Sequence, residues 1–120
     1  MKKLSIALVI ALLCGAVAMA STAGARGKAA TTVTIKYNGD GFQGKVKSSR
    51  AKCVKNRLVK VYKQSGSSQD PNNDQKMFTD GTDNEGNWDT GNSGQAHGKF
   101  YAVAKGTTSC KKGFSKTIKV

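Results

Sequence analysis

The stretch RLVKVYK, residues 57–63, alternates apolar and basic side chains with a period of two residues. Successive side chains of a β-strand point to opposite faces, so Val59 and Val61 are expected to face a core while Lys60 faces solvent. Leu58 and Tyr62 would then partly cover the outer face. The stretch therefore predicts one strand of a sheet with one buried side.

Short segments of the same kind lie on both sides of this strand, and turns rich in Gly, Asn and Asp separate them. Trp88 is expected to anchor the core, and residues 99–105 are apolar on both faces, which is typical of a central strand. Residues 64–76 contain no apolar side chain and predict an exposed loop. The pattern predicts an antiparallel β-sandwich of about seven strands. The expected strands besides 57–63 are 32–37, 42–48, 77–79, 87–90, 99–105 and 115–120.

The first residues have the pattern of a signal peptide. Lys2 and Lys3 precede an apolar run, and Ala-Met-Ala at 18–20 predicts cleavage after Ala20, with a second candidate site at 23–25. We expect a signal peptide at 1–20, a disordered leader at 21–31 and a folded domain at 32–120. An uncleaved anchor is the alternative, since the run approaches the lower limit of about 17 residues for a membrane span. Cleavage would leave no stable span.

The cysteines agree with export. Cys14 would leave with the signal peptide, so Cys53 and Cys110 remain as a single pair. Outside the cytoplasm, two cysteines far apart in sequence predict a structural disulfide. A metal site would need more ligands than this pair and His97 supply. We therefore expect a secreted or envelope-associated domain with one disulfide.

The chain is strongly basic, and this predicts an anionic partner. Losing Lys2 and Lys3 lowers the formal charge by two, from +13 to about +11. If Cys53 and Cys110 are bonded, their Cα atoms lie about 5.5 Å apart, so the basic groups near each cysteine meet at one end of the domain. The alternative is that these cations only solvate the outer faces of strands. The candidate polyanion-binding residues are Arg50, Lys52, Lys55, Arg57, Lys60, Lys111, Lys112 and Lys116.

The sequence contains no clear motif for metal binding, catalysis or nucleic-acid binding. Asp80, Asp83 and Glu85 are candidates for weak calcium binding, but they do not match an EF-hand loop. The favoured alternative is that these residues form turns and balance nearby lysines. His97 lies in a glycine-rich loop without a catalytic motif around it. We expect no enzyme, no catalytic residue and no cofactor. Nucleic acid is not expected as a partner, because no aromatic platform is interleaved with the lysines.

Three longer stretches, FQGKVKSSRAKCVKNRLVKVYK, TDNEGNW and GKFYAVAK, carry a resemblance to a known family. The chain resembles small exported proteins of Gram-positive bacteria that belong to the carboxypeptidase regulatory-like, or transthyretin-like, β-sandwich group. The resemblance covers residues 32–120 and implies an accessory, adhesive or scaffolding module. It rests on Gly44, Val46, Val59, Val61, Thr82, Asp83, Gly86, Trp88, Gly98, Phe100, Ala102 and Ala104.

We therefore expect a secreted, non-catalytic module with a binding or structural role at the cell envelope. Its basic surface would contact an anionic cell-wall polymer or a polysaccharide. The alternative is an accessory or inhibitory domain that docks a protein partner through its loops. An exposed apolar patch around Leu58 and Tyr62 would favour that alternative.

Overall fold

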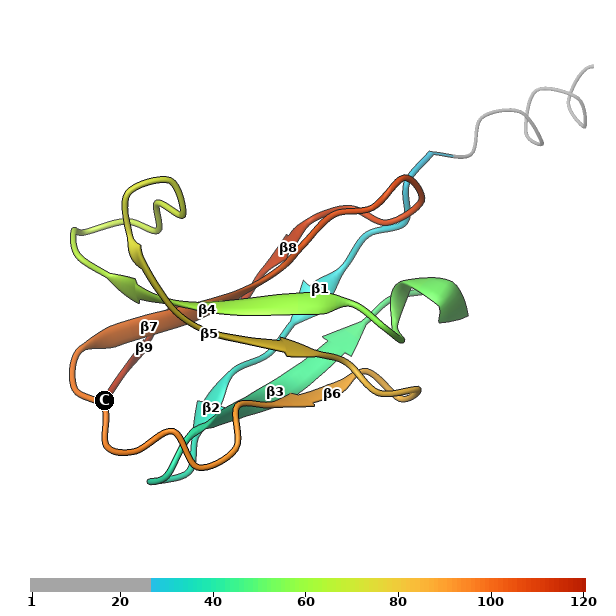
Figure 1. Ribbon diagram of the computed structural model, residues 1–120. Coiled ribbons are helices and arrows are strands. Elements are labelled where there is room, and N and C mark those ends of the chain that lie inside the picture. Colours follow the sequence, from blue (N-terminus) through green and yellow to red (C-terminus); the bar gives the residue numbers. More distant parts are fainter. Residues whose placement is uncertain (1–26) are drawn as a thin grey trace, which may run out of the picture.

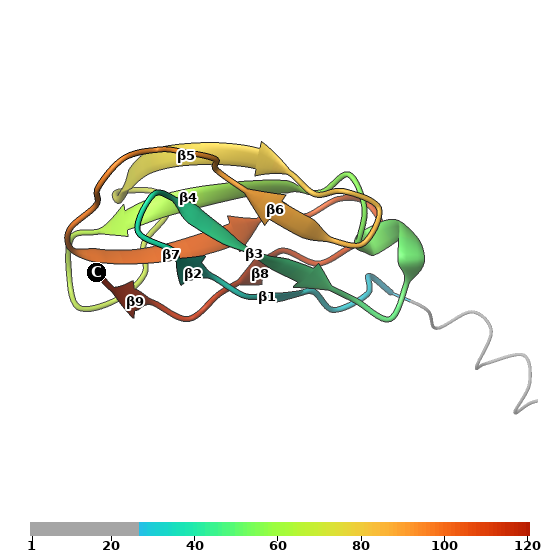
Figure 2. The same ribbon diagram turned by 90° about the horizontal axis from the view of Figure 1, so that it is seen from below.

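The computed structural model describes residues 27–120, which form two antiparallel β-sheets packed face to face (Figures 1 and 2). The predicted signal peptide at 1–20 lies outside the described residues. Among the described residues, no helix is long and apolar enough to span a membrane. The four-stranded sheet contains β1 (Thr32–Val33), β2 (Lys36–Tyr37), β3 (Phe42–Lys47) and β6 (Asn87–Asp89). The five-stranded sheet contains β4 (Leu58–Gln64), β5 (Gln75–Gly81), β7 (Lys99–Ala104), β8 (Gly113–Phe114) and β9 (Ile118–Lys119).

Two of the strands are interrupted, which explains why nine segments make a seven-stranded sandwich. β1 and β2 pair with β3 in one unbroken register, and Thr34 between them donates its backbone N–H to Lys45 O. β8 and β9 both pair with β7, with a short irregular segment between them. Counting each interrupted strand once confirms the predicted fold class and strand number.

The core lies between the sheets and follows the period-two pattern of the sequence. Apolar residues from both sheets interdigitate there, and the rings of Phe42 and Phe100 lie 4.8 Å apart between centroids. Trp88 is buried as expected. Burying one such large side chain stabilises the fold by about 1.5–3 kcal/mol. The buried members are Val33, Ile35, Phe42, Val46 and Trp88 from the small sheet and Val59, Val61, Phe100, Ala102 and Ala104 from the large one.

Gly44 is one of the residues that carry the family resemblance, and the structure gives it a steric role. It lies opposite Trp88 in the pairing of β3 with β6. A Cβ atom at Gly44 would lie 2.7 Å from Cζ2 of the indole, which is closer than van der Waals contact allows. The glycine therefore leaves the space that the Thr34 carbonyl and the Trp88 ring occupy beside the strand.

Two expected boundaries are wrong. Residues 28–31 belong to the domain, because Ala29 donates to Ser109 O and accepts from Lys111 N, at 2.9 and 2.8 Å. The expected leader at 21–31 thus ends too late. β5 runs over Gln75–Gly81 and is longer than the expected 77–79, because pairing with β4 holds polar residues that the sequence pattern assigned to a loop and a turn.

The disulfide between Cys53 and Cys110 is present as predicted, with the Cα atoms 5.5 Å apart. Cys53 ends the short 3₁₀ turn η1 (Ala51–Cys53), and Cys110 lies three residues before β8. Both sulfurs are buried against Ala29. A loop closed over 57 residues is worth about 4 kcal/mol in the chain-entropy model.

Candidate polyanion-binding surface

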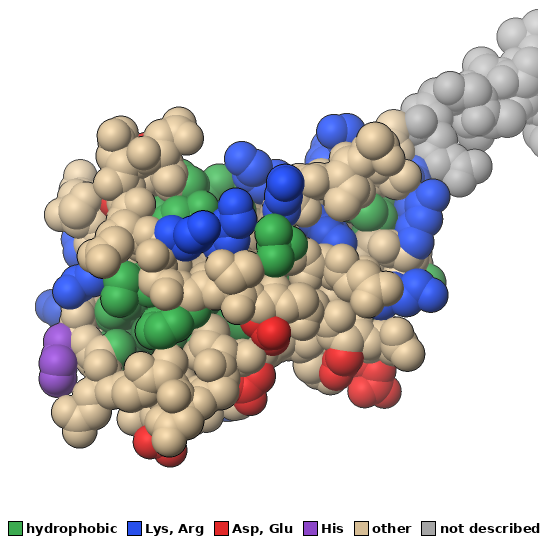
Figure 3. Space-filling view, viewed as in Figure 1, with side chains coloured by type: hydrophobic (Ala, Val, Ile, Leu, Met, Phe, Trp, Pro, Cys, Tyr) green, Lys and Arg blue, Asp and Glu red, His purple; other side chains and the backbone are tan. Residues whose placement is uncertain are grey.

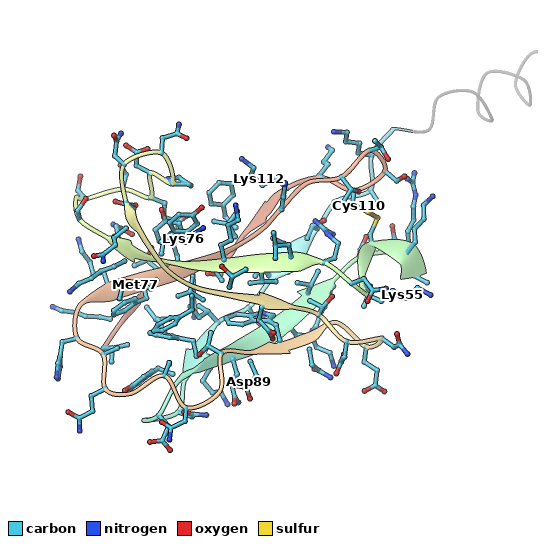
Figure 4. All side chains as sticks on the ribbon, in the orientation of Figure 1. Lys55, Lys76, Met77, Asp89, Cys110 and Lys112 are labelled. Carbon is cyan, nitrogen blue, oxygen red and sulfur yellow. A yellow bond between two sulfur atoms is a disulfide. The ribbon has the colours of Figure 1, made fainter. Side chains whose placement is uncertain are left out.

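Basic and acidic side chains are segregated on the face of the molecule that carries β4 and β5 (Figure 3). Lys and Arg side chains gather over the middle of this face and at the end that carries the disulfide, and most of the visible acidic side chains lie along the lower part. Figure 4 shows the same division, with Lys76 and Lys112 above the large sheet and Asp89 below it. The segregation gives one side of the domain a positive potential.

A groove of about 680 Å³ lies on the outer face of the five-stranded sheet. Alternation along the strands turns Tyr62 of β4 and Val103 of β7 outward, and these side chains contribute an apolar floor. One wall contains Pro71 from the loop after β4, and the other is the segment after β7. The basic residues that line the groove are Lys28, Lys60, Lys105 and Lys112.

The floor of the groove is anchored by a pair of stacked tyrosines. The rings of Tyr62 and Tyr101 lie 5.5 Å apart and nearly parallel, and Tyr101 is completely buried. Tyr101 Oη donates to Asp74 Oδ2 at 2.6 Å. Burial, with the nearby carboxylate, raises the pKa of the Tyr101 phenol well above its usual range. Tyr101 therefore acts as a fixed donor beneath the groove.

Asp74 holds the first wall in place. Besides the Tyr101 hydroxyl, this carboxylate accepts from the Ser65 N–H, the Ser65 hydroxyl and the Asp70 N–H, at 3.1, 2.9 and 2.8 Å. These donors, the Tyr101 hydroxyl first, lower the pKa of Asp74 to about 2. The loop that carries Pro71 is thereby fastened to the sheet by one ionised side chain.

Arg57 holds the second wall, and for that reason it is not part of the binding surface. Its side chain is 2% exposed, so the expectation that it contacts a polyanion is wrong. The guanidinium donates to Cys53 O at 2.7 Å, Lys105 O at 2.9 Å and Lys111 O at 3.0 Å. A further hydrogen bond of 3.1 Å reaches Thr31 Oγ1. Burial lowers the pKa of Arg57, but a guanidinium stays charged in proteins.

A second hollow, of about 430 Å³, lies at the disulfide end and is lined by Lys28, Arg50, Lys52 and neighbouring backbone. Arg50 is fixed there, because its guanidinium donates to Gly27 O at 2.7 Å and to Ser109 O at 3.1 Å. Lys52 is exposed on η1.

Apart from the buried Arg57, the predicted cations divide into three groups. Lys60 and Lys112 line the groove, Arg50 and Lys52 line the hollow, and Lys55, Lys111 and Lys116 line neither. Sequence reasoning missed Lys28 and Lys105. Lys105 lies on the same outer face of the strand as Tyr101 and Val103, so the period of two could have predicted its position. Lys28 carried none, because it precedes the first predicted strand.

The side chains of Asp80 and Asp83 accept hydrogen bonds from backbone N–H groups. Asp83 Oδ1 accepts from the N–H groups of Glu85 and Asn87, both at 2.9 Å, and these contacts lower its pKa. Asp80 Oδ2 accepts from Asp89 N at 2.7 Å. In the described part of the chain, no three His, Cys, Asp or Glu side chains are arranged to hold a metal ion. Asp80, Asp83 and Glu85 are therefore not brought together as a calcium site.

The apolar patch that would favour a protein partner is not formed around Leu58 and Tyr62. Leu58 is 37% exposed, but Tyr62 is only 8% exposed and lies against Tyr101. Lys60 separates the two along the strand. The exposed apolar surface around this pair is a single leucine, and single exposed apolar side chains are common on protein surfaces.

The chain matches no family model, no curated protein and no solved structure. The family resemblance stays a prediction.

Proposed function

We propose that this chain is an exported, non-enzymatic module that binds an anionic polymer of the cell envelope on the outer face of its five-stranded sheet. The observation that supports the proposal is the groove, in which four lysines surround an apolar floor. No acidic residue lines it. The domain therefore offers its polymer a groove whose charged side chains are all positive.

The electrostatics favour a polymer over a single small anion. One exposed ion pair contributes only about 0–1 kcal/mol, so affinity has to come from many weak contacts. Several lysines on one concave surface raise the local potential, and a charged chain can meet them together. Salt screens exposed charges with a Debye length of about 8 Å at physiological strength, so binding should weaken steeply as salt rises.

The disulfide supports the choice of an envelope polymer, because it suggests an oxidising environment. A buried disulfide persists outside the reducing cytoplasm, where envelope polymers rich in phosphate or carboxylate are the abundant anions. The wall segments are held by Arg57 and Asp74, so the groove exists before a ligand arrives. A preformed site loses less ordering entropy on binding.

The test is binding to polygalacturonate, a linear polymer of carboxylated sugars, at low and high salt. The groove variant is K60E/K112E. Its matched control is K36E/K47E, with the same change in charge at exposed positions of the small sheet. We expect the groove variant to bind about tenfold more weakly or worse, and the control to stay near wild type. Equal losses in both variants would show that net charge alone is responsible, and absence of binding at low salt would reject the function.

A further inference from the structure

The groove and the hollow at the disulfide end are neighbours that share two lining residues, Lys28 and Thr108. We infer that one linear polyanion runs from the groove to the hollow, so that the domain recognises a chain long enough to fill two subsites. This inference rests on the proposed function and adds the length of ligand that the surface requires.

The junction between the two subsites is rigid. Lys28 precedes Ala29, whose backbone is bonded to Ser109 and Lys111. Thr107 Oγ1 accepts from the N–H groups of Ser109 and Cys110, at 3.3 and 3.0 Å. Lys28 and Thr108 are therefore held on two segments that are fastened to each other.

The hollow is preformed by the same contacts. Arg50 bridges Gly27 O and Ser109 O, so its guanidinium joins both rims. The disulfide lies directly behind, because Cys53 follows Lys52 and Cys110 follows Ser109. A positively charged end is thus covalently tied to the segment that forms the wall of the groove.

The distribution of charge along this path indicates that the ligand is a linear polymer. Three lysines line only the groove, Lys28 lies at the junction, and Arg50 and Lys52 line only the hollow. None of the residues lining either hollow is acidic. A small anion can occupy only one subsite at a time. A chain held in the groove meets the hollow as an intramolecular event, and its affinity gains from the high effective concentration.

The apolar side chains at the groove indicate which class of polyanion would bind there. Tyr62 and Val103 lie beneath the groove but are only 8% and 5% exposed, so the more accessible apolar surface is the ring of Phe114, which lies opposite Val103 in the pairing of β7 with β8. Phe114 is 43% exposed, and Lys112 Nζ lies 5.9 Å above its ring. Sugar rings present faces of C–H groups that pack on such surfaces, whereas a bare phosphate chain has none. The chemistry favours an anionic polysaccharide.

The experiment measures affinity by calorimetry against size-fractionated galacturonate oligomers, from trisaccharide to long chains, with inorganic polyphosphate of matched charge as a second arm. The hollow variant is K52E. Its control is K55E, a neighbouring exposed lysine with the same charge change that lines neither subsite and lies on the other side of η1 from Cys110 (Figure 4). Arg50 is left intact because it fastens the backbone.

For wild type, affinity should rise with length well beyond the trisaccharide. K52E should lower affinity for the long oligomer roughly tenfold and leave the trisaccharide unchanged, while K55E leaves both within about twofold. K112E should weaken both lengths. Polyphosphate should bind more weakly than the galacturonate of equal charge.

Three results would overturn the inference. Equal affinity for short and long oligomers would mean a single subsite, and the proposed function would survive. Equal losses in K52E and K55E would mean diffuse attraction to a basic end. If neither oligomer nor polyphosphate binds at low salt, the proposed function fails and the inference with it. Tighter binding of polyphosphate would reject the polysaccharide but leave the two-subsite path.

Discussion

Two buried charges, Arg57 and Asp74, hold the two walls of the groove in opposite chemical ways. Arg57 donates its hydrogen bonds to three carbonyl groups and a hydroxyl from separate segments. Asp74 accepts its hydrogen bonds from N–H and O–H groups of one loop and from Tyr101. Each replaces water with protein groups of the opposite polarity, so neither needs a charged partner nearby.

The two side chains differ in whether a change of pH can remove their charge. A guanidinium is charged at every pH at which the protein is folded. A carboxylate with a pKa of about 2 loses its charge in acid. The wall held by Arg57 is also crosslinked by the disulfide, whereas the wall held by Asp74 depends on hydrogen bonds. We therefore expect the wall held by Arg57 to be permanent and the wall held by Asp74 to depend on pH.

The largest effect should come from Arg57→Met. The substitution gives an apolar side chain of similar length but leaves the carbonyls of Cys53 and Lys105 without the guanidinium donor, and buried unpaired groups are costly. Lys111 O keeps a second donor, the Thr31 hydroxyl at 2.7 Å. We expect the free energy of unfolding in denaturant to fall by about 3–5 kcal/mol. Lys55→Met, at an exposed position, should change it by less than about 0.5 kcal/mol. A loss in Arg57→Met no larger than in this control would show that the guanidinium does not hold the wall.

A smaller effect is expected from Asp74→Asn. The amide nitrogen cannot accept from either the Asp70 N–H or the Tyr101 hydroxyl, so the loop after β4 should loosen. Limited proteolysis should cut within residues 65–73 faster than in wild type, while the disulfide end stays protected. Unchanged cleavage would contradict the role of Asp74.

Wild type and Asp74→Asn also test how the free energy of unfolding depends on pH. The pKa of Asp74 is about 2 in the folded protein and about 3.9 when unfolded, so its contribution is present above pH 4 and is lost as pH falls toward 2. The difference in unfolding free energy between wild type and Asp74→Asn should shrink over this window. Arg57→Met should keep its deficit throughout. A difference for Asp74→Asn that is constant with pH would contradict the assignment.

The smallest effect should come from Tyr101→Phe. The ring remains stacked on Tyr62, and only the hydroxyl that donates to Asp74 is lost. We expect a loss of about 1 kcal/mol in stability. The pKa of Asp74 should rise because its strongest donor is gone, and a carboxyl titration by NMR would measure this. An unshifted pKa would mean that the donors from Ser65 and Asp70 alone set it.

The sequence predicted the strands well because a period of two survives wherever one face of a sheet is buried. The same rule places Arg57 on the inward side with Val59 and Val61, so its burial could have been predicted. The lysines around it in the sequence instead suggested that it belongs to a surface cluster. The contact between Asp74 and Tyr101 spans 27 residues, and no local pattern encodes it. The groove also depends on register, since Lys60 meets Val103 only through the pairing of β4 with β7.

The central claim is that an anionic chain lies on the outer face of the five-stranded sheet. Backbone NMR shifts recorded while galacturonate oligomers are added test it most directly. The proposal predicts perturbations concentrated at Lys60, Val103, Lys105 and Lys112, with residues 83–87 at the acidic turn unmoved. Perturbations centred on that turn, or spread evenly over all lysines, would contradict it.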